Sequence, residues 1–225
     1  MEKAALQQLL IHCEKNAPLP KFQSGFCKYH STETALLKVQ NDILTSMDNT
    51  EVTPLVLLNL SAVFDATEHS ILLNILQQDF GVAGTALNRF DSFLSGCKKR
   101  ILVGDKTSDD FNLNCGVPQG SCKGPVLFSL YISRLLDIIS LNLPSVHGYA
   151  ADTQIYLSFR PCSIHSEINA VSLIEKCIAD VCSWFIGHRL MINDAKTDFL
   201  IIAPVNNLRK HLLNLLLLVT PSLNL

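Results

Sequence analysis

Apolar side chains recur at helical spacing through the first fifth of the chain. Over residues 2–16 they fall on one helical face, and Asn16 with the prolines that follow it predicts where this helix ends. Ser31 or Thr32 is the predicted cap of a second helix. The residues predicted to form the buried stripe of that helix are Leu36, Val39, Ile43 and Met47.

The apolar pattern then changes to a nearly continuous run over residues 54–60, which predicts a strand that is buried on both faces. Asp65 and Glu68 have the spacing of a capping box, so a helix is predicted from Asp65 to near Gly81. The remaining predicted elements are helices over about 84–95, 125–139 and 164–186, a hairpin with strands 99–104 and 111–115, and a strand over 198–203. Strands and helices interleave, which predicts an α+β fold.

Residues 147–159 read as strand, tight turn and strand, with Asp152 at the turn. A carboxylate on a stiff hairpin between apolar strands can hold a divalent metal. An Asp at such a position is more often explained by ordinary turn chemistry. The other motifs of the chain are needed to distinguish a metal ligand from an ordinary turn residue.

Composition supports a folded core and limits the partners. Hydrophobic residues make up 48% of the 225 residues, and 18 Lys and Arg against 20 Asp and Glu give a net charge of -2. A role in binding nucleic acid therefore has to rest on a local basic patch, because each phosphate contact needs a cation. The best candidate is residues 98–100 with Lys106, and a solvated edge strand is the alternative interpretation.

The eight cysteines form no Cys-x-x-Cys pair, and the histidines show no zinc-type spacing around them, so we expect free thiols in a reducing compartment. The first residues lack the apolar core of a signal peptide, and apolar runs such as residues 215–219 are too short to span a membrane. We expect a soluble intracellular protein, nuclear or cytoplasmic, that does not associate with a membrane. Its oligomeric state is left open.

Six short segments follow one another in a fixed order. They are LPKFQSGF at 19–26, HSTETALL at 30–37, LNLSAVFD at 58–65, GVPQGS with GP at 116–125, YAAD at 149–152, and LMIN with KT at 190–197. Together they resemble the reverse transcriptase domain of a non-LTR (LINE-type) retrotransposon. The resemblance implies a right-hand polymerase fold with fingers and palm.

We expect residues 1–52 to be partial fingers, 53–205 the palm with its catalytic hairpin near 146–159, and 206–225 a Leu-rich tail. We expect the thumb to be absent.

The resemblance also implies an RNA-directed DNA polymerase, a nucleotidyltransferase that extends a DNA primer on an RNA template. Two Mg²⁺ ions held by carboxylates would activate the primer 3′-hydroxyl and stabilise the leaving pyrophosphate. The family's strand motif has Asp where this chain has Asn59, and its hairpin has Asp where this chain has Ala151. Asp152 is the carboxylate that remains, with Asn59 as a weak ligand. If each lost carboxylate removes ~3 kcal/mol of transition-state stabilisation, the rate falls roughly a hundredfold each time. We therefore expect this chain to be inactive or severely impaired, and to bind Mg²⁺ and template–primer poorly.

Further roles follow from the resemblance. Lys196 matches a lysine that protonates the pyrophosphate, and Phe64 matches an aromatic that closes off the sugar 2′ side. Gln119 and Gly120 would let the backbone approach nucleotide or template, and Tyr149 would pack beside the primer end. The alternatives are a surface lysine, a core phenylalanine and a plain loop.

Two other functions stay open: a non-catalytic nucleic-acid-binding remnant that uses the 98–106 patch, and an interaction protein that uses the Leu-rich tail. Further departures from the family at Cys27, Gly96 and Lys123 favour the unselected decay of a retroelement copy.

Overall fold

The computed structural model describes residues 2–16, 22–25, 27–61, 63–118 and 120–204. The chain separates into two compact units that interleave along the sequence. The first unit contains residues 1–19, 62–132 and 188–190, and the second contains 20–61, 133–187 and 191–225. The division into fingers and palm at residue 52 stays a prediction, and the Leu-rich tail lies outside the described residues.

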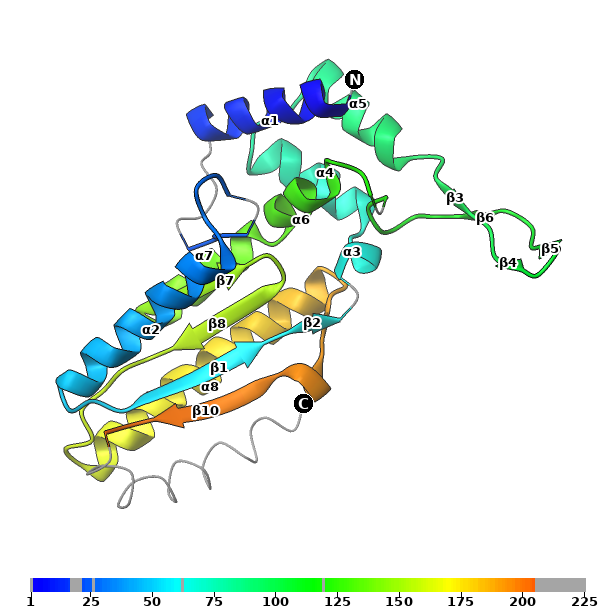
Figure 1. Ribbon diagram of the computed structural model, residues 1–225. Coiled ribbons are helices and arrows are strands. Elements are labelled where there is room, and N and C mark those ends of the chain that lie inside the picture. The colour runs from blue at the N-terminus through cyan, green and yellow to red at the C-terminus, as the bar shows by residue number, and fades with distance from the viewer. Residues whose placement is uncertain (1, 17–21, 26, 62, 119, 205–225) are drawn as a thin grey trace. The chain divides into compact units, whose positions relative to one another are not determined.

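The second unit is built on a four-stranded antiparallel sheet with strand order β10-β1-β8-β7 (Figure 1). In the described part of the chain, three α-helices and a short two-stranded ladder complete it. Its elements are α2 (Thr32–Asp48), β1 (Thr53–Leu58), β2 (Leu60–Ser61), α7 (Ser133–Asn142), β7 (Ser145–Tyr149), β8 (Asp152–Tyr156), α8 (Ile164–Gly187), β9 (Met191–Ile192), a 3₁₀ turn (Asp194–Lys196) and β10 (Asp198–Ile202).

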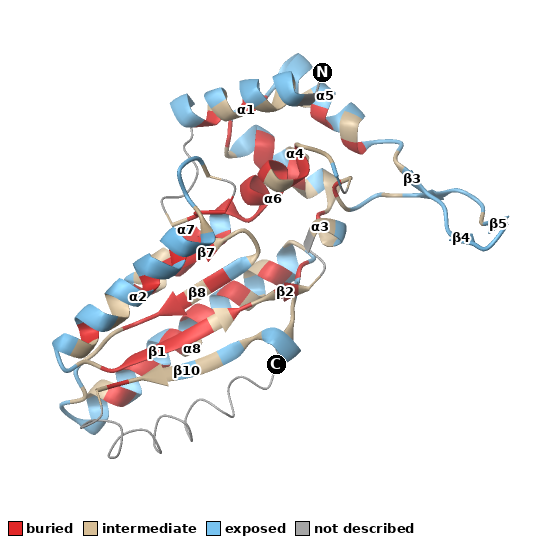
Figure 2. Ribbon diagram, viewed as in Figure 1, coloured by how far each residue is buried: buried red, intermediate tan, exposed pale blue. Residues whose placement is uncertain are grey.

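Helices cover both faces of this sheet. Leu55 of β1 lies opposite Tyr156 of β8, and both pack against Val39 of α2. Neighbouring residues along a strand point to opposite faces. The other face accordingly packs on α8, where Val171 lies in one cluster with Phe199 of β10. Figure 2 shows β1 and β8 as largely buried. The prediction of a strand buried on both faces is confirmed, and the sheet fixes where β1 ends.

Helix α2 begins as predicted, and of its predicted buried stripe Val39 is buried, Ile43 and Met47 are half-buried and Leu36 is exposed. Ser31 is the cap, and it forms a capping box with Thr34. The residues that face the sheet are Ala35, Val39 and Ser46, whereas Leu36 is 67% exposed. The buried hydroxyl of Ser46 is satisfied there, because it donates a hydrogen bond to Ser158, at 2.8 Å. Burial of Leu36 is therefore a wrong prediction.

The first unit gathers short helices around α4 and α6. Its elements are α1 (Glu2–Asn16), α3 (Val63–Ala66), α4 (His69–Gln78), α5 (Gly84–Leu94), β3 (Lys98–Lys99), β4 (Leu102–Val103), β5 (Lys106–Thr107), β6 (Phe111–Asn112) and α6 (Gly124–Tyr131). The predicted hairpin is present, since β3 pairs with β6 and β4 with β5. All four of these strands are exposed (Figure 2).

The predicted cap at Asp65 is wrong. Asp65 lies inside the short helix α3, and α4 starts only after Glu68, whose carboxylate accepts hydrogen bonds from the backbone and hydroxyl of Ser70. The Gly-rich loop at residues 115–121 explains why the chain forms two helices, α3 and α4, where one was predicted. Gly116 N–H donates to the carbonyl of Thr67, at 2.7 Å, and Val117 N–H donates to that of Phe64, at 2.8 Å. A continuous helix would have used these carbonyls itself.

The helix predicted over 125–139 is split in two at Ile132, whose ψ of 1° lies outside the helical range. This residue is also where the chain passes from the first unit to the second. The stretch Gly124–Asn142 has the length and apolarity of a membrane-spanning helix, but 67% of it is buried within the protein. That burial is typical of core helices.

Candidate active site

The β7–β8 hairpin carries the acidic turn. Tyr149 pairs with Asp152 at its end, and Ala150 and Ala151 form the turn between them. Ala150 adopts the left-handed conformation with φ of 55°, which costs a residue other than glycine some free energy. The Asp152 side chain is exposed, and Tyr149 and Ala151 are half-buried. The sequence thus predicted the two strands and the turn, but it placed Asp152 in the turn itself, whereas Asp152 is the first residue of β8, and it did not predict the backbone strain.

A buried glutamine holds this turn in place. Gln23 is 4% exposed, and its Oε1 accepts hydrogen bonds from the backbone of Gly25, at 2.7 Å, and of Ala150, at 3.0 Å. The backbone beside it also pairs with β7, since Ser24 N–H donates to the carbonyl of Gly148, at 2.8 Å. One side chain therefore satisfies the two backbone donors that the strained turn leaves near it. Sequence reasoning missed this role, although a glutamine before a glycine within the 19–26 segment was a usable signal.

Asn59 and Asp152 are in direct contact. Asn59 follows β1 and Asp152 begins β8, which pairs with β1. The amide Nδ2 of Asn59 donates a hydrogen bond to Oδ1 of Asp152, at 2.9 Å. The structure thus brings together two of the three positions, 59, 151 and 152, that the resemblance assigns to the metal. It places a donor against an acceptor where two carboxylates were expected.

The backbone of Asn59 is anchored by the segment that carries Lys196. Asn193 N–H donates to the carbonyl of Asn59, at 2.9 Å, and Asn59 N–H donates to the hydroxyl of Thr197, at 3.3 Å. Lys196 ends the 3₁₀ turn between these two residues, and its side chain is exposed. The segment 191–197 therefore lies beside the end of β1, as the order of the motifs leads one to expect. The proton-donor role of Lys196 stays a prediction.

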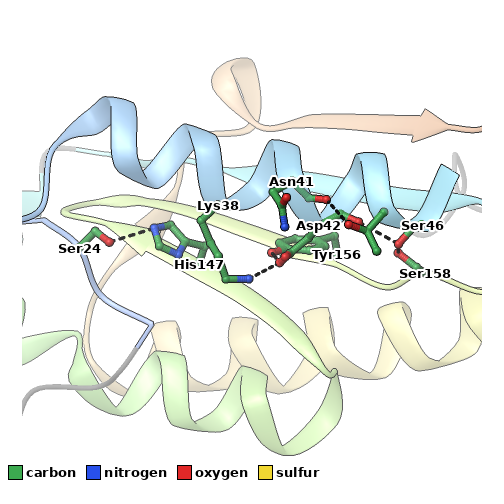
Figure 3. A network of polar contacts seen from close by, with 9 residues as sticks. Ser24, Lys38, Asn41, Asp42, Ser46, His147, Tyr156 and Ser158 are labelled. Atoms are coloured by element: carbon green, nitrogen blue, oxygen red, sulfur yellow. Dashed lines mark hydrogen bonds and ion pairs between the residues drawn. The ribbon is translucent and has the colours of Figure 1, made fainter. Parts of the chain in front are cut away.

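A polar network lies between α2 and the sheet, in the same unit as the hairpin (Figure 3). Asp42 of α2 forms an ion pair with Lys38 and accepts a hydrogen bond from the hydroxyl of Tyr156, at 2.6 Å. Burial raises the pKa of the Asp42 carboxyl, but the hydrogen bonds from Lys38 and Tyr156 outweigh burial and lower the pKa overall. His147 of β7 is 8% exposed, and its Nε2 lies 3.1 Å from the hydroxyl of Ser24. The network joins α2 and the segment before it to the hairpin strands.

The burial of His147 leads us to expect that stability depends on pH. Burial lowers the pKa of His147, and the positive charges of Lys38 and His30 lower it further, against a smaller opposing effect of Asp42. A histidine with a lowered pKa in the folded state takes up its proton more readily when unfolded. We expect the Tm to fall as the pH drops below about 6.5, the ordinary pKa of histidine, with the loss continuing until the folded-state pKa is passed.

Thermal unfolding between pH 5 and pH 8 measures this effect. A His147→Gln variant, which cannot titrate, should show a flatter profile in this window, and an exposed control, His165→Gln, should keep the wild-type slope. Equal slopes for wild type and His147→Gln would contradict the assignment.

The other predicted binding residues belong to the first unit. Phe64 packs on Phe128, with ring centroids 5.1 Å apart, which agrees with the alternative of core packing. Gly120 has a φ of 84° that favours glycine, while Gln119 lies outside the described residues. Lys123, a departure from the family, is 5% exposed and its Nζ lies 3.9 Å from the ring centroid of Phe93. The contacts with nucleotide or template stay predictions for Phe64, Gln119 and Gly120.

The donor set does not fit the Mg²⁺ ions that the resemblance implies. Mg²⁺ requires hard oxygen ligands in a near-octahedral arrangement. Here one carboxylate faces an amide NH₂ group, and Ala151 contributes a methyl group. Over the described residues, no three side chains of His, Cys, Asp or Glu come together as a metal site would need. Of the three positions that the resemblance assigns to the metal, 59, 151 and 152, only residue 152 carries a carboxylate.

A helix-covered antiparallel sheet with an acidic hairpin beside its central strand is the palm arrangement of a right-hand polymerase. Solved structures of telomerase share this fold. The apo enzyme of Candida tropicalis, lacking its C-terminal domain, superposes with a TM-score of 0.64 at 13% identity, over 89% of this chain and 40% of that one. Telomerase of Candida albicans with a fragment of telomeric RNA gives 0.64 at 11% identity, over 88% of this chain and 34% of that one.

Sequence comparison then defines the family. The profile described as "Reverse transcriptase (RNA-dependent DNA polymerase)" matches residues 1–213, and the chain belongs to this family. The Drosophila melanogaster polymerase of mobile element jockey is 32% identical over 135 residues, 60% of this chain and 14% of the relative. That of transposon BS is 24% identical over 184 residues, 80% of this chain and 20% of the relative. The relatives are polymerases of non-LTR retrotransposons, and the chain spans about a fifth or less of their length.

Proposed function

We propose that this chain is a reverse transcriptase domain of a non-LTR retrotransposon that no longer polymerises. The observation that carries the proposal is the hydrogen bond from Asn59 Nδ2 to Asp152 Oδ1, at 2.9 Å. Residue 59, at one expected ligand position, therefore donates a hydrogen bond to Asp152, the carboxylate that remains, and does not offer it a second carboxylate. Ala151 removes the other expected ligand. Phosphoryl transfer is catalysed almost entirely by positioning and by stabilisation of charge. Loss of the metal-binding carboxylates therefore removes the main contribution to the rate.

A primer-extension assay tests the proposal. The purified chain is incubated with an RNA template, a DNA primer and deoxynucleotides in Mg²⁺ and, separately, in Mn²⁺. We expect no extension above that of a no-protein control in either metal. A ladder of extended products from the unaltered chain would overturn the proposal. A known active reverse transcriptase in the same buffer serves as the positive control.

Nucleic-acid binding without catalysis is the second candidate. Lys98, Lys99, Arg100 and Lys106 are all exposed on the hairpin of the first unit, which supports it. Asp110 weakens the case, because it forms ion pairs with Lys98, at 3.3 Å, and with Arg100.

This candidate predicts RNA or DNA binding that falls steeply with salt, because bound cations release counterions from the phosphates. Asp110→Asn should tighten the binding and Lys99→Gln should weaken it in a fluorescence-anisotropy titration. An absence of binding at ~50 mM salt, where phosphate contacts are strong, excludes this candidate.

A further inference from the structure

A cavity of about 420 Å³ lies between α2 and the strands β7 and β8. Its lining comes from three parts of the second unit, namely the segment before α2, α2 itself and the two strands. Phe22, Tyr29 and Pro144 contribute apolar surface, and none of residues 59, 151 and 152 lines it. A cavity of this size, with apolar walls and a few polar groups, is typical of a site for a small molecule.

Basic side chains from all three parts meet at this cavity. Lys38 comes from α2, His30 from the segment before it and His147 from β7. In Figure 3, Lys38 extends from α2 toward His147 and Tyr156 of the strands. An ammonium group has three N–H donors, and the ion pair with Asp42 occupies one of them, so Lys38 keeps donors for a ligand.

The negative charge in the lining is already balanced. Oδ2 of Asp42 accepts hydrogen bonds from both Lys38 and the hydroxyl of Tyr156. Among the described residues that line the cavity, no other side chain is acidic. Because Lys38 balances Asp42, any proton taken up by His30 or His147 gives the cavity a net positive charge.

The buried histidine of the lining has a ring nitrogen without a partner. His147 is 8% exposed, and its Nε2 lies 3.1 Å from the hydroxyl of Ser24, which is 3% exposed. Its Nδ1 makes no hydrogen bond with any described residue. Buried polar groups in proteins almost always have a partner, and a ligand oxygen in the cavity can supply one.

The electrostatics of the cavity favour an anion. Burial lowers the pKa of His147, and the positive charges of Lys38 and His30 lower it further, with Asp42 opposing them. The three basic groups are thus close enough to repel one another when all are protonated. An anion bound among them offsets this repulsion, so its binding is coupled to proton uptake by the histidines.

We propose that this cavity binds a small phosphomonoester, whose phosphate group is held by Lys38, His30 and His147. A phosphomonoester carries a charge of about −1.5 to −2 at pH 7 and three acceptor oxygens, which suits three basic groups better than a single negative charge does. The apolar surface of Phe22 and Tyr29 is available to its organic part. The proposal goes beyond the loss of polymerase activity and does not rest on it.

Isothermal titration calorimetry of the unaltered chain with phenyl phosphate tests the proposal. We expect saturable binding at one site, and weaker binding of inorganic phosphate, which lacks the apolar part. Lys38→Ala should weaken the binding by about tenfold or more, because it removes a hydrogen bond between charged groups. The Lys38 side chain is 58% exposed, so we expect its loss to leave the fold intact.

Asp42→Asn separates binding from a structural role. The amide keeps an oxygen that can accept from Tyr156, and it removes a negative charge beside the phosphate, so this variant should bind phenyl phosphate more tightly. A purely structural Asp42 would give weaker binding instead. Lys176→Ala removes an exposed lysine of α8, on the other face of the sheet, and should leave the affinity unchanged.

The pH dependence is measured with sulfate, because sulfate keeps its charge between pH 6 and pH 8 and phosphate does not. The affinity for sulfate should rise as the pH falls through this range, since the anion stabilises the protonated histidines. His147→Gln should reduce this rise, whereas His165→Gln, at an exposed position of α8, should leave it as it is.

The proposal is overturned if phenyl phosphate shows no saturable binding, or if Lys38→Ala binds it as well as Lys176→Ala does. An Asp42→Asn variant that does not bind more tightly, or a sulfate affinity that is independent of pH, would equally contradict it. Displacement of phenyl phosphate by a single-stranded oligonucleotide without terminal phosphates would assign the cavity to a nucleic-acid backbone instead. None of these measurements involves primer extension, so failure here is distinct from failure of the proposed function.

Discussion

Gly25→Ala is expected to destabilise the second unit by several kcal/mol. A Cβ at this position would lie 2.1 Å from the backbone nitrogen of Ala150 and 2.7 Å from its Cα. Both are backbone atoms of the strained turn, so no side chain can move aside to make room. Overpacking of this kind costs typically 1–3 kcal/mol and more where backbone has to shift, and here the hydrogen bonds of Gln23 would be lost with it.

Chemical unfolding measures this loss as a lower midpoint with an unchanged slope. The matched control is Gly187→Ala, at the end of α8, where an added Cβ meets nothing within 4 Å. Its stability should stay within ~0.5 kcal/mol of the unaltered chain, because an exposed methyl makes no new contact there. A Gly25→Ala variant as stable as this control would show that the turn does not depend on the close approach of residue 25.

Restoring both carboxylates, by Asn59→Asp with Ala151→Asp, is expected to restore polymerisation from an undetectable level. If each missing ligand removes ~3 kcal/mol of transition-state stabilisation, each restored one returns roughly a hundredfold in rate. Either single variant should gain far less than the pair, because the ligands act as one unit and their effects are not additive. Single-nucleotide incorporation on an RNA template with a DNA primer measures these rates.

Ala151→Asn is the matched control for the pair, combined with Asn59→Asp. It restores size and polarity at residue 151 without the charge, and it should leave the rate well below that of the two aspartates. If the pair of aspartates shows no incorporation while it binds Mn²⁺, the polymerase segments that lie outside this chain limit activity more than the ligand set does. The chain spans about a fifth or less of its relatives, so this outcome is physically reasonable.

The sequence predicted those features that depend on local pattern. The continuous apolar run before Asn59 predicts a strand buried on both faces, and β1 is such a strand. The first helix ends at Asn16 as the prolines after it require. The order of six motifs identified the family and put the Asn59 and Asp152 positions in one site, which the structure brings within 2.9 Å.

Features that depend on distant partners could not be predicted in this way. The burial of Ser46 in α2 accompanies its hydrogen bond to Ser158, which lies 112 residues away in the sequence. The cap at Glu68 follows from the Gly-rich loop, which binds the carbonyls of Phe64 and Thr67 across about fifty residues. No helical or strand periodicity encodes such contacts. The orientation of the Asn59 amide is likewise set by its partner, and residue type alone leaves it open.

The pairing of Asn59 with Asp152 is the central feature of the molecule, and paramagnetic broadening by Mn²⁺ tests it most directly. In an amide ¹H–¹⁵N spectrum titrated with Mn²⁺, a bound ion broadens the signals of nearby residues. We predict no saturable broadening centred on residues 59 and 150–153 of the unaltered chain, and clear broadening there when both residues 59 and 151 are aspartate. Saturable broadening at these residues in the unaltered chain would contradict the account, because it would show that the hairpin still holds a divalent metal.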